Sequence, residues 1–306
     1  MWRIARFGSL ARYLTWLPAG YPIDCRFLLG FTAHFLRWTC FSAAVSRGYA
    51  RHFYDSSTAP LMSGVSVLRT FGNKLYQHAF PIYRPVYAAY KAYADHAERQ
   101  LVRQILVPGA VAIDAGANIG IYSQFLARCV GPTGAVYSFE PAPENFERLR
   151  TAARGFSNMY LLQAAVGERS GKSELYLSDR LNVDHRTYLA DNSARRVLQI
   201  EMVALDDYFK PGQRVDFIKM DVQGYELHAL RGTGRVLDDN PAAKLLLELW
   251  PYGLKQAGAN WVELIDALTT KKMTVSEVTR RGLVPLRSGS ITEDPDCYVN
   301  LFASQR

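Results

Sequence analysis

Residues 114–120 are the stretch of this chain whose residue types and spacing point most directly to chemistry. They read D-A-G-A-N-I-G and follow the apolar run 111–113. A glycine turn after a buried strand is typical of a nucleotide site, where backbone N–H groups approach the ligand. The spacing differs from the G-x-G-x-x-G of dinucleotide sites, because Asn118 replaces the second glycine and Asp114 precedes the first. The ligand of this turn has to be compatible with both differences.

Carboxylates also follow two later apolar runs. Glu140 ends the second run in Y-S-F-E-P, and Asp221 follows the fourth in K-M-D-V-Q-G-Y-E. In a doubly wound sheet the ligand lies beyond the carboxyl ends of the strands, so both acids are expected beside Asp114. Glu140 is suited to accept hydrogen bonds from both hydroxyls of a ribose, which NAD and S-adenosylmethionine share. An ordinary strand–turn–helix junction would explain the glycine turn alone, but not the acids at matching strand ends.

The turn favours S-adenosylmethionine over a dinucleotide. A carboxylate at position 114 would repel a phosphate, whereas it can attract the ammonium of the methionine tail. Gly116 lets backbone come close, Asn118 offers amide hydrogen bonds, and Gly120 lets the following helix pack tightly. The predicted cofactor-binding residues are Asp114, Gly116, Asn118, Gly120, Glu140, Ala165, which follows the third strand-like run, and Asp221.

Catalysis of methyl transfer needs an acceptor held about 3–3.5 Å from the methyl group, and a general base adds typically about 10²–10⁴-fold for a hydroxyl acceptor. Asp221 is the first candidate for the catalytic neighbourhood, and Lys219 shares its strand face. Glu226 is the third catalytic candidate, and it is expected with Glu248 at the border of the acceptor site. The structural alternatives are a helix N-cap for Asp221, a paired buried lysine, and a helix-dipole contact for Glu226.

Two further groups of polar residues are interpreted as structural. For His185 and His228 a surface position is favoured over a role as base. The pair Asp206-Asp207 is typical of a solvated turn, so no metal is expected.

The elements that position these residues alternate between strand and helix, a pattern that predicts a parallel sheet covered on both faces. A break at 81–85 precedes the first helix. Two final runs, 273–278 and 297–303, are expected to form a hairpin that adds the last strand antiparallel. The other expected strands are 111–113, 136–139, 159–162, 215–220 and 245–249, and the expected helices are 86–106, 120–129, 143–153, 225–237 and 261–268.

Two regions are expected outside this alternation. Residues 171–209 are an insertion after the third parallel strand, with strand-like runs at 174–177 and 197–203 around a polar loop, 178–195, that is a candidate lid. Residues 1–51 hold seven arginines and one acid, which accounts for +6 of the chain's net charge of +8. Apolar residues recur there at helical spacing, which leaves open a helix packed on the body, a membrane-surface anchor and a targeting peptide. Nucleic-acid binding is disfavoured, because large aliphatic residues separate the arginines.

Three motifs in order resemble those of the FkbM-type S-adenosylmethionine-dependent methyltransferases. They are V-A-I-D-A-G-A-N-I-G, S-F-E-P-A-P-E-N-F and D-F-I-K-M-D-V-Q-G-Y-E, within a similarity that runs from about Glu98 to Leu301. The resemblance implies an α/β fold, the Rossmann-like class I methyltransferase sheet of seven strands with the last antiparallel. It also implies methylation of a hydroxyl on a sugar, glycolipid or polyketide product. Where the family commonly has D-V-E-G this chain has Gln223, which removes one carboxylate near the methyl donor.

We therefore expect residues 81–306 to form an S-adenosylmethionine-dependent O-methyltransferase domain and residues 1–80 a basic, aromatic-rich helical extension. The expected acceptor is a small molecule or a lipid-linked glycan. A non-catalytic S-adenosylmethionine-binding scaffold and an NAD-dependent oxidoreductase are the alternatives. Four cysteines without a C-x-x-C favour the cytoplasm, and residues 1–50 leave a peripheral position on the membrane open. The acceptor, the choice of oxygen over nitrogen and the oligomeric state stay open.

Overall fold

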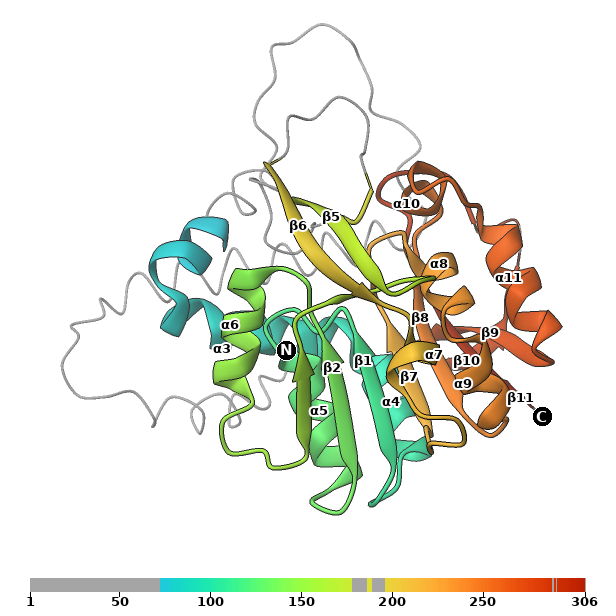
Figure 1. The fold of residues 1–306 in the computed structure, drawn as a ribbon, viewed down its shortest axis with the longest axis horizontal. Coiled ribbons are helices and arrows are strands. Elements are labelled where there is room, and N and C mark those ends of the chain that lie inside the picture. Colours follow the sequence, from blue (N-terminus) through green and yellow to red (C-terminus); the bar gives the residue numbers. More distant parts are fainter. Residues whose placement is uncertain (1–71, 178–185, 189–195, 288, 290, 306) are drawn as a thin grey trace, which may run out of the picture. The chain divides into compact units, whose positions relative to one another are not determined.

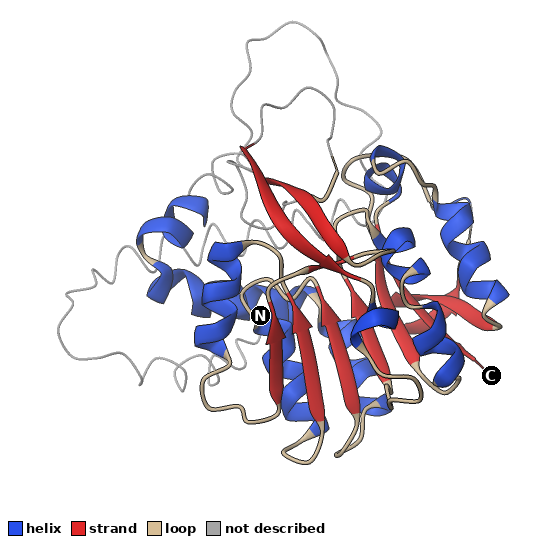
Figure 2. Cartoon of the chain, viewed as in Figure 1, coloured by secondary structure: helices blue, strands red, loops and turns tan. Residues whose placement is uncertain are grey.

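The computed structural model describes residues 72–177, 186–188, 196–287, 289 and 291–305 of the chain. Within these ranges there are two β-sheets, and helices cover both faces of the larger one (Figure 1 and Figure 2). The predicted arm, residues 1–50, and most of the predicted loop 178–195 lie outside the described residues. The division into residues 1–80 and 81–306 therefore stays a prediction.

The larger sheet has eight strands in the order β10-β9-β11-β8-β7-β1-β2-β3. The five strands from β8 to β3 are parallel, and β11 is antiparallel to both of its neighbours. This order confirms the predicted Rossmann-like class I methyltransferase sheet with its last strand antiparallel. The strands are β1 (Val111–Ala115), β2 (Ala135–Phe139), β3 (Met159–Leu162), β7 (Phe217–Met220), β8 (Lys244–Leu249), β9 (Met273–Thr279), β10 (Gly282–Pro285) and β11 (Val299–Gln305).

The edge strand β10 is an addition to the predicted seven. The strands β9 and β11 are antiparallel neighbours, but the expected hairpin between them is wrong. The chain reverses after β9 so that Gly282 pairs with Thr279, and β10 becomes the hairpin partner of β9. The hydroxyl of Thr279 accepts a hydrogen bond from the backbone N–H of Arg281, which stabilises the short turn.

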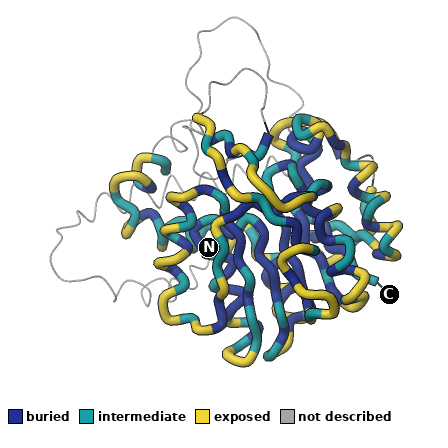
Figure 3. The backbone as a smooth tube through the Cα atoms, viewed as in Figure 1, coloured by how far each residue is buried: buried dark blue, intermediate teal, exposed yellow. Residues whose placement is uncertain are grey.

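Two layers of helices enclose the sheet. Buried side chains of α8, α9 and α11 pack on one face, and those of α4, α5 and α6 pack on the other. Figure 3 shows the central strands as the most continuously buried part of the chain. The helices are α3 (Phe80–Ala94), α4 (His96–Ile105), α5 (Ile121–Val130), α6 (Pro143–Ala152), α7 (Leu205–Tyr208), α8 (Glu226–Arg231), α9 (Gly234–Asp239), α10 (Pro251–Gln256) and α11 (Trp261–Thr270), and residues 72–78 are also helical.

Two long predicted helices are each divided in two. The predicted helix 86–106 begins earlier, at Phe80, because Pro81 occupies the first turn, where a missing N–H costs no helical hydrogen bond. It breaks at Asp95, whose ψ of 25° departs from helical geometry. The predicted helix 225–237 is interrupted at Gly232, where a Cβ atom would lie 2.0 Å from the carbonyl oxygen of Gly167. Close packing between backbones therefore ends α8.

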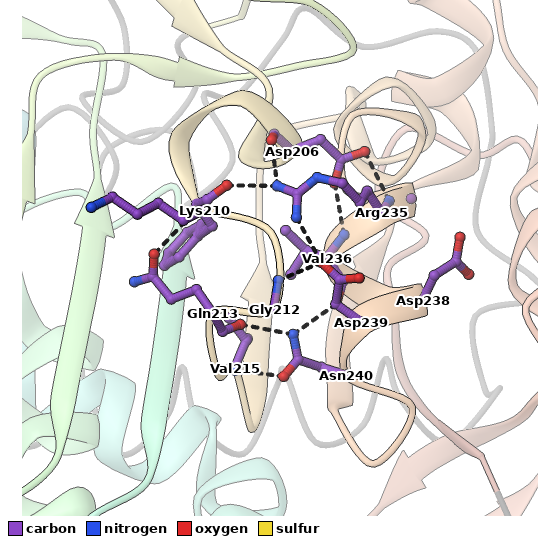
Figure 4. Close-up of polar contacts among 12 residues, drawn as sticks. Asp206, Lys210, Gly212, Gln213, Val215, Arg235, Val236, Asp238, Asp239 and Asn240 are labelled. Atoms are coloured by element: carbon purple, nitrogen blue, oxygen red, sulfur yellow. Dashed lines mark hydrogen bonds and ion pairs between the residues drawn. The ribbon is translucent and has the colours of Figure 1, made fainter.

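The N-terminus of α9 is capped by a residue that lies about 30 positions earlier in the sequence. Asp206 accepts hydrogen bonds from the backbone N–H groups of Arg235 (2.9 Å) and Val236 (2.8 Å), as Figure 4 shows. In the same network the side chain of Asn240 donates to the carbonyl oxygen of Gln213 (3.0 Å). The interpretation of Asp206 as a solvated turn residue is therefore wrong, because its carboxylate satisfies donors that the first turn of a helix leaves free.

The predicted insertion contributes most of the second, three-stranded sheet, of order β4-β6-β5. Its strands are β4 (Ala165–Val166), β5 (Gly171–Leu177) and β6 (Arg196–Val203). Residues 186–188 return to this sheet, since the backbone of Arg186 pairs with that of Tyr176. In Figure 1, β5 and β6 lie beyond the upper ends of β1, β2 and β7.

Candidate functional site

A row of polar side chains crosses the carboxyl ends of the parallel strands. Asp114 of β1 is in register with Ser138 of β2 and Lys219 of β7. Met220 is in register with Leu247, so the next residues, Asp221 and Glu248, are adjacent across β7 and β8. Because side chains alternate along a strand, Lys219 and Asp221 share a face with Asp114. The sheet therefore brings residues that are up to 134 positions apart into one line.

Asp114 is fully buried and already has partners. Its Oδ2 accepts a hydrogen bond from the Ser123 hydroxyl (2.6 Å), and its Oδ1 lies 3.5 Å from Lys219 Nζ. Lys219 also lies 3.4 Å from Asp221 Oδ2. Burial alone would lower the pKa of Lys219, but the carboxylates of Asp221 and Asp114 outweigh it and raise that pKa. Lys219 is thus a charged link between two carboxylates.

The two predicted glycines of the turn are required by packing against the protein itself. Gly116 has φ of +82°, and a Cβ atom there would lie 1.9 Å from the carbonyl oxygen of Asp221. Gly120, also at φ of +82°, would place a Cβ atom 2.7 Å from the side chain of Leu149 on α6. Gly116 therefore allows the turn after β1 to touch the end of β7, and Gly120 allows α5 to begin against α6.

Glu140 holds the same turn from β2. Its Oε2 accepts a hydrogen bond from the backbone N–H of Asn118 (2.8 Å), and its Oε1 accepts one from that of Ala142 (2.9 Å). Asn118 has φ of +50° and its side-chain oxygen accepts from the N–H of Ile119. Burial raises the pKa of Glu140 to about 7, against the hydrogen bonds that lower it. The side chain of Asn145 also forms a hydrogen bond with Glu140. Since a carboxylate can accept about four hydrogen bonds, Glu140 retains the capacity for a further donor.

Asp221 and Glu248 form a second pair of acids, joined by an amide. The side-chain nitrogen of Gln223 donates to Asp221 Oδ1 at 2.9 Å and lies 3.5 Å from Glu248 Oε2. Burial and the Asp221 carboxylate raise the pKa of Glu248 well above its ordinary value. The pKa of Asp221 is lowered, because Lys219 and Lys91 outweigh its burial. The pKa of Glu248 therefore lies above that of Asp221.

The loop after β7 is held from two directions. Gln223 adopts a left-handed backbone conformation, with φ of +56°, that non-glycine residues rarely use. Its carbonyl oxygen accepts a hydrogen bond from the Tyr188 hydroxyl (2.9 Å), which comes from the insertion. Gly224 follows with φ of +93°, and a Cβ atom there would lie 2.7 Å from the same hydroxyl. Tyr188 of the predicted lid region is therefore part of the site.

Glu226 is hydrogen-bonded to the loop that follows β7. Its side chain is fully buried, and its Oε1 accepts hydrogen bonds from the backbone N–H groups of Gly224 (3.0 Å) and Val222 (3.3 Å). Burial raises its pKa to about 7. In this position the carboxylate shapes the loop that carries Gln223. A catalytic role for Glu226 stays a prediction.

Two other candidates lie beside the site rather than in it. Ala165 is buried in β4, among the apolar residues that join β4 to β5 and β6. A role for Ala165 in cofactor binding stays a prediction. The ring nitrogens of His228 lie 3.2 Å from the carbonyl oxygen of Ala257 and 3.4 Å from Glu168 Oε2, and its ring stacks on Tyr225. These contacts hold α8 in place, and His185 lies outside the described residues.

Two residues of the site have no signal in the motifs. Ser123 lies on the first turn of α5, and only the structure shows its hydroxyl on Asp114. Lys91 comes from α3, before the matched motifs, and its ammonium acts on both Asp221 and Glu248. It also pairs with Asp95 one helical turn later (2.9 Å). The i, i+4 spacing of Lys91 and Asp95 predicts the ion pair but not its place beside the strands.

The residues fit S-adenosylmethionine better than a phosphate-containing ligand. Asp114 Oδ1 and Glu140 are buried anionic groups at the turn, and Asp114 Oδ1 has no hydrogen-bond donor. Carboxylates suit a cationic ligand and its ribose hydroxyls, and they oppose a pyrophosphate. Within the described ranges, no group of three acidic, histidine or cysteine side chains could hold a metal ion. No helix of those ranges has the length and apolarity that crossing a bilayer requires.

The motifs and strands of this site coincide with a known domain. Residues 114–249 match the family model described as the methyltransferase FkbM domain. The matched segment begins at Asp114 and ends one residue after Glu248, so it contains the whole carboxylate row. The resemblance predicted from the motifs is confirmed for this segment.

Three curated proteins are similar to the chain over segments of 148 to 151 residues. Methyltransferase 1 of Beauveria bassiana is 29% identical, over 42% of this chain and 58% of that protein. The 2-O-methyltransferase NoeI of Sinorhizobium fredii is 25% identical, over 44% and 61% of the two chains. The hexuronic acid methyltransferase AglP of Haloferax volcanii is 27% identical, over 46% and 58%. The chain spans about three fifths of the length of these relatives.

Proposed function

Because residues 114–249 match the methyltransferase FkbM domain, we propose that the chain transfers a methyl group from S-adenosylmethionine to a hydroxyl of a sugar or related small molecule. One observation carries the proposal. Asp114, Glu140, Asp221 and Glu248 stand at the carboxyl ends of four adjacent parallel strands, and all of them lie inside the matched segment 114–249. This edge is where doubly wound sheets bind their ligands.

The turn side of the row is assigned to the cofactor. S-adenosylmethionine supplies a methyl group already activated by a sulfonium, so the chain has to bind, orient and remove a proton. Glu140 is positioned to accept hydrogen bonds from ribose hydroxyls through the lone pairs that its present hydrogen-bond donors leave free. Asp114 and Lys219 form a buried ion pair next to the turn.

The β7–β8 side of the row is assigned to the acceptor. Asp221 and Glu248 are only partly buried, unlike Asp114 and Glu140, so a hydroxyl can reach them. Two relatives support a sugar or sugar-like acceptor and transfer to oxygen, since one is named a 2-O-methyltransferase and the other a hexuronic acid methyltransferase. The positive charges of Lys91 and Lys219 would offset the negative charge of an acceptor that carries a carboxylate.

The test measures S-adenosylhomocysteine release from the full chain with a panel of methyl glycosides that includes a neutral hexose, a deoxyhexose and a hexuronic acid. We expect release with at least one glycoside and a new O-methyl signal in the product's NMR spectrum. Asp221→Asn should abolish most of the release. The exposed Glu147→Gln on α6 is the matched control and should leave it unchanged.

Binding measurements distinguish the alternatives. Calorimetry should show S-adenosylhomocysteine binding to the chain and no binding of NAD. Binding without release on any acceptor would favour the non-catalytic scaffold. Binding of NAD in place of S-adenosylhomocysteine would overturn the cofactor assignment.

A further inference from the structure

The acids at the ends of β7 and β8 form an unequal pair. Both lie on the sheet face that carries Asp114 and Lys219, and neither is fully buried. Asp221 has a donor on each oxygen, Gln223 at 2.9 Å from Oδ1 and Lys219 at 3.4 Å from Oδ2. Glu248 has one long contact, 3.5 Å, between its Oε2 and the Gln223 amide, and it shares a hydrogen bond with Asp221. Glu248 therefore receives fewer donors than Asp221 and has more capacity to accept a hydrogen bond from a substrate hydroxyl.

We propose that Glu248 is the general base of the methyl transfer and that Gln223 is the positioning residue that keeps Asp221 as a fixed anion beside it. This inference rests on the proposed function. It makes Glu248 the base of the acceptor side and gives Asp221 and Lys219 supporting roles. Asp221 raises the proton affinity of Glu248, and Lys219 neutralises Asp221.

The electrostatics of the neighbourhood agree with this division. Burial and the Asp221 carboxylate raise the pKa of Glu248, and a base with a raised pKa takes a proton from a hydroxyl more readily. Against its own burial, Asp221 has a lowered pKa because of Lys219, Lys91, Gln223 and the hydrogen bond that it shares with Glu248. Glu248 acts as the base once that shared proton has left the pair. The other titratable groups that act on the pair are Glu226 of α8 and Tyr87 of α3.

Gln223 is built to hold the pair. A glutamine at this position donates to both carboxylates, whereas a glutamate would place a third negative charge between them. Its left-handed backbone conformation costs free energy, and persists because surrounding contacts fix it. Those contacts are the Tyr188 hydroxyl on its carbonyl oxygen and the N–H groups that Glu226 binds on either side of it. The protein thus holds one amide in one orientation.

The proposed step balances as follows. A lone pair of the acceptor oxygen forms the new bond to the methyl carbon. The bond from that carbon to sulfur breaks, and its electron pair stays on the sulfur of S-adenosylhomocysteine. The hydroxyl proton passes to the Glu248 carboxylate, which later releases it to solvent.

The first test needs no acceptor. Carboxyl ¹³C NMR of glutamate-labelled protein, saturated with S-adenosylhomocysteine, would follow the titration of Glu248, with its signal assigned by Glu248→Gln. We expect its pKa to lie above that of exposed glutamates, to fall in Asp221→Asn and to rise in Gln223→Glu. Glu147→Gln is the matched control and should not move the signal. A Glu248 that titrates with the exposed glutamates, or that ignores Asp221→Asn, would overturn the proposal.

The second test uses any glycoside that the wild-type chain methylates. Glu248→Gln should lower kcat at least about 100-fold, within the usual range for a general base. Its affinity for S-adenosylhomocysteine and its melting temperature should stay near those of the wild type. Glu248→Asp should recover part of the rate, and Gln223→Glu should shift the pH profile of kcat to higher pH. A Glu248→Gln variant that is folded and fully active would refute the base.

The two tests separate this inference from the proposed function. A wild-type chain that binds S-adenosylhomocysteine but methylates nothing would count against the function, and the NMR titration would still decide whether the pair exists. A chain that methylates a glycoside without needing Glu248 would retain the function and lose this inference.

Discussion

The two sides of the carboxylate row are built in different ways. On the turn side, Glu140 is buried against local backbone and its two oxygens each accept one backbone N–H within the turns that follow β1 and β2. On the β7–β8 side, Asp221 and Glu248 are partly exposed and share one amide, that of Gln223. The turn side is a frame held by local backbone hydrogen bonds, in which Asp114 Oδ1 is the one described carboxylate oxygen that lacks a hydrogen-bond donor, and the β7–β8 side is a group of charges that depend on one another.

This difference indicates where each kind of chemistry resides. A preorganised frame suits a ligand that is the same in every turnover. Donors and acceptors that are already held in place lose little conformational entropy when the ligand binds. Coupled carboxyl groups suit proton transfer, because each controls the proton affinity of the other. Besides the pairing of β1 with β7, two further features join the sides, the Lys219 ammonium and the packing of Gly116 on the Asp221 carbonyl.

Gly116→Ala should have the largest effect, because it breaks the packing link between the two sides. The new methyl group would lie 1.9 Å from the Asp221 carbonyl oxygen, in a backbone conformation that alanine disfavours. We expect a loss of about 3 kcal/mol or more in the free energy of unfolding. Urea denaturation followed by circular dichroism would measure it.

Gly155→Ala provides the control for this substitution. Gly155 has a similar φ of +90°, but nothing lies within 4 Å of its added Cβ atom. Only backbone strain should remain, at roughly 1–2 kcal/mol. Equal losses in the two variants would show that the contact with Asp221 does not join the sides.

Glu140→Gln should have the next largest effect and should act on the turn side alone. The amide keeps one oxygen for a backbone N–H, but its NH₂ group opposes the second N–H and removes the charge that a ribose would meet. We expect S-adenosylhomocysteine affinity to fall by roughly 10–150-fold, equivalent to about 1.5–3 kcal/mol. Calorimetry measures this, with Glu144→Gln on the exposed start of α6 as the control. Unchanged affinity would remove Glu140 from the cofactor site.

The sequence predicts the two sides to different degrees, for the same physical reason. Asn118 and Glu140 act through neighbours within 22 residues, so motif and strand pattern together predict their positions. Lys91 and Tyr188 reach the β7–β8 side from α3 and from the insertion, and no local pattern specifies where those segments pack. The contacts of Glu226 with its own loop could not be predicted, because a carboxylate in a first helical turn has the same spacing whether it faces a ligand or its own loop.

Glu226→Gln should change the dependence of stability on pH. Burial raises the pKa of Glu226 to about 7, so between about pH 4.5 and 7 the folded state keeps a proton that the unfolded chain has released. Stability from this group is therefore full below pH 4.5 and is lost as pH rises through 7, at up to about 1.4 kcal/mol per pH unit. Denaturation midpoints from pH 5 to 8 should decline less steeply in Glu226→Gln.

The same measurement tests whether the two sides titrate separately. Glu140 also has a pKa raised to about 7 by burial, on the turn side. In the double variant Glu140→Gln, Glu226→Gln, the change in the pH dependence of stability should equal the sum of the changes in the two single variants. The effects of groups without shared partners usually add. A strongly non-additive result would show that the turn and the loop after β7 titrate as one unit.

Tyr188→Phe should have the smallest effect and should touch only the β7–β8 side. It removes the hydroxyl that donates to the Gln223 carbonyl oxygen and keeps the ring. A hydrogen bond of this kind contributes about 0.5–1.5 kcal/mol net, so a loss of about 1 kcal/mol is expected in urea denaturation. S-adenosylhomocysteine affinity should stay unchanged, because the turn after β1 makes no contact with this hydroxyl in the described hydrogen bonds. Tyr160→Phe on exposed β3 is the control. A loss of affinity in Tyr188→Phe alone would mean that the loop after β7 communicates with the turn, and the division into two sides would fail.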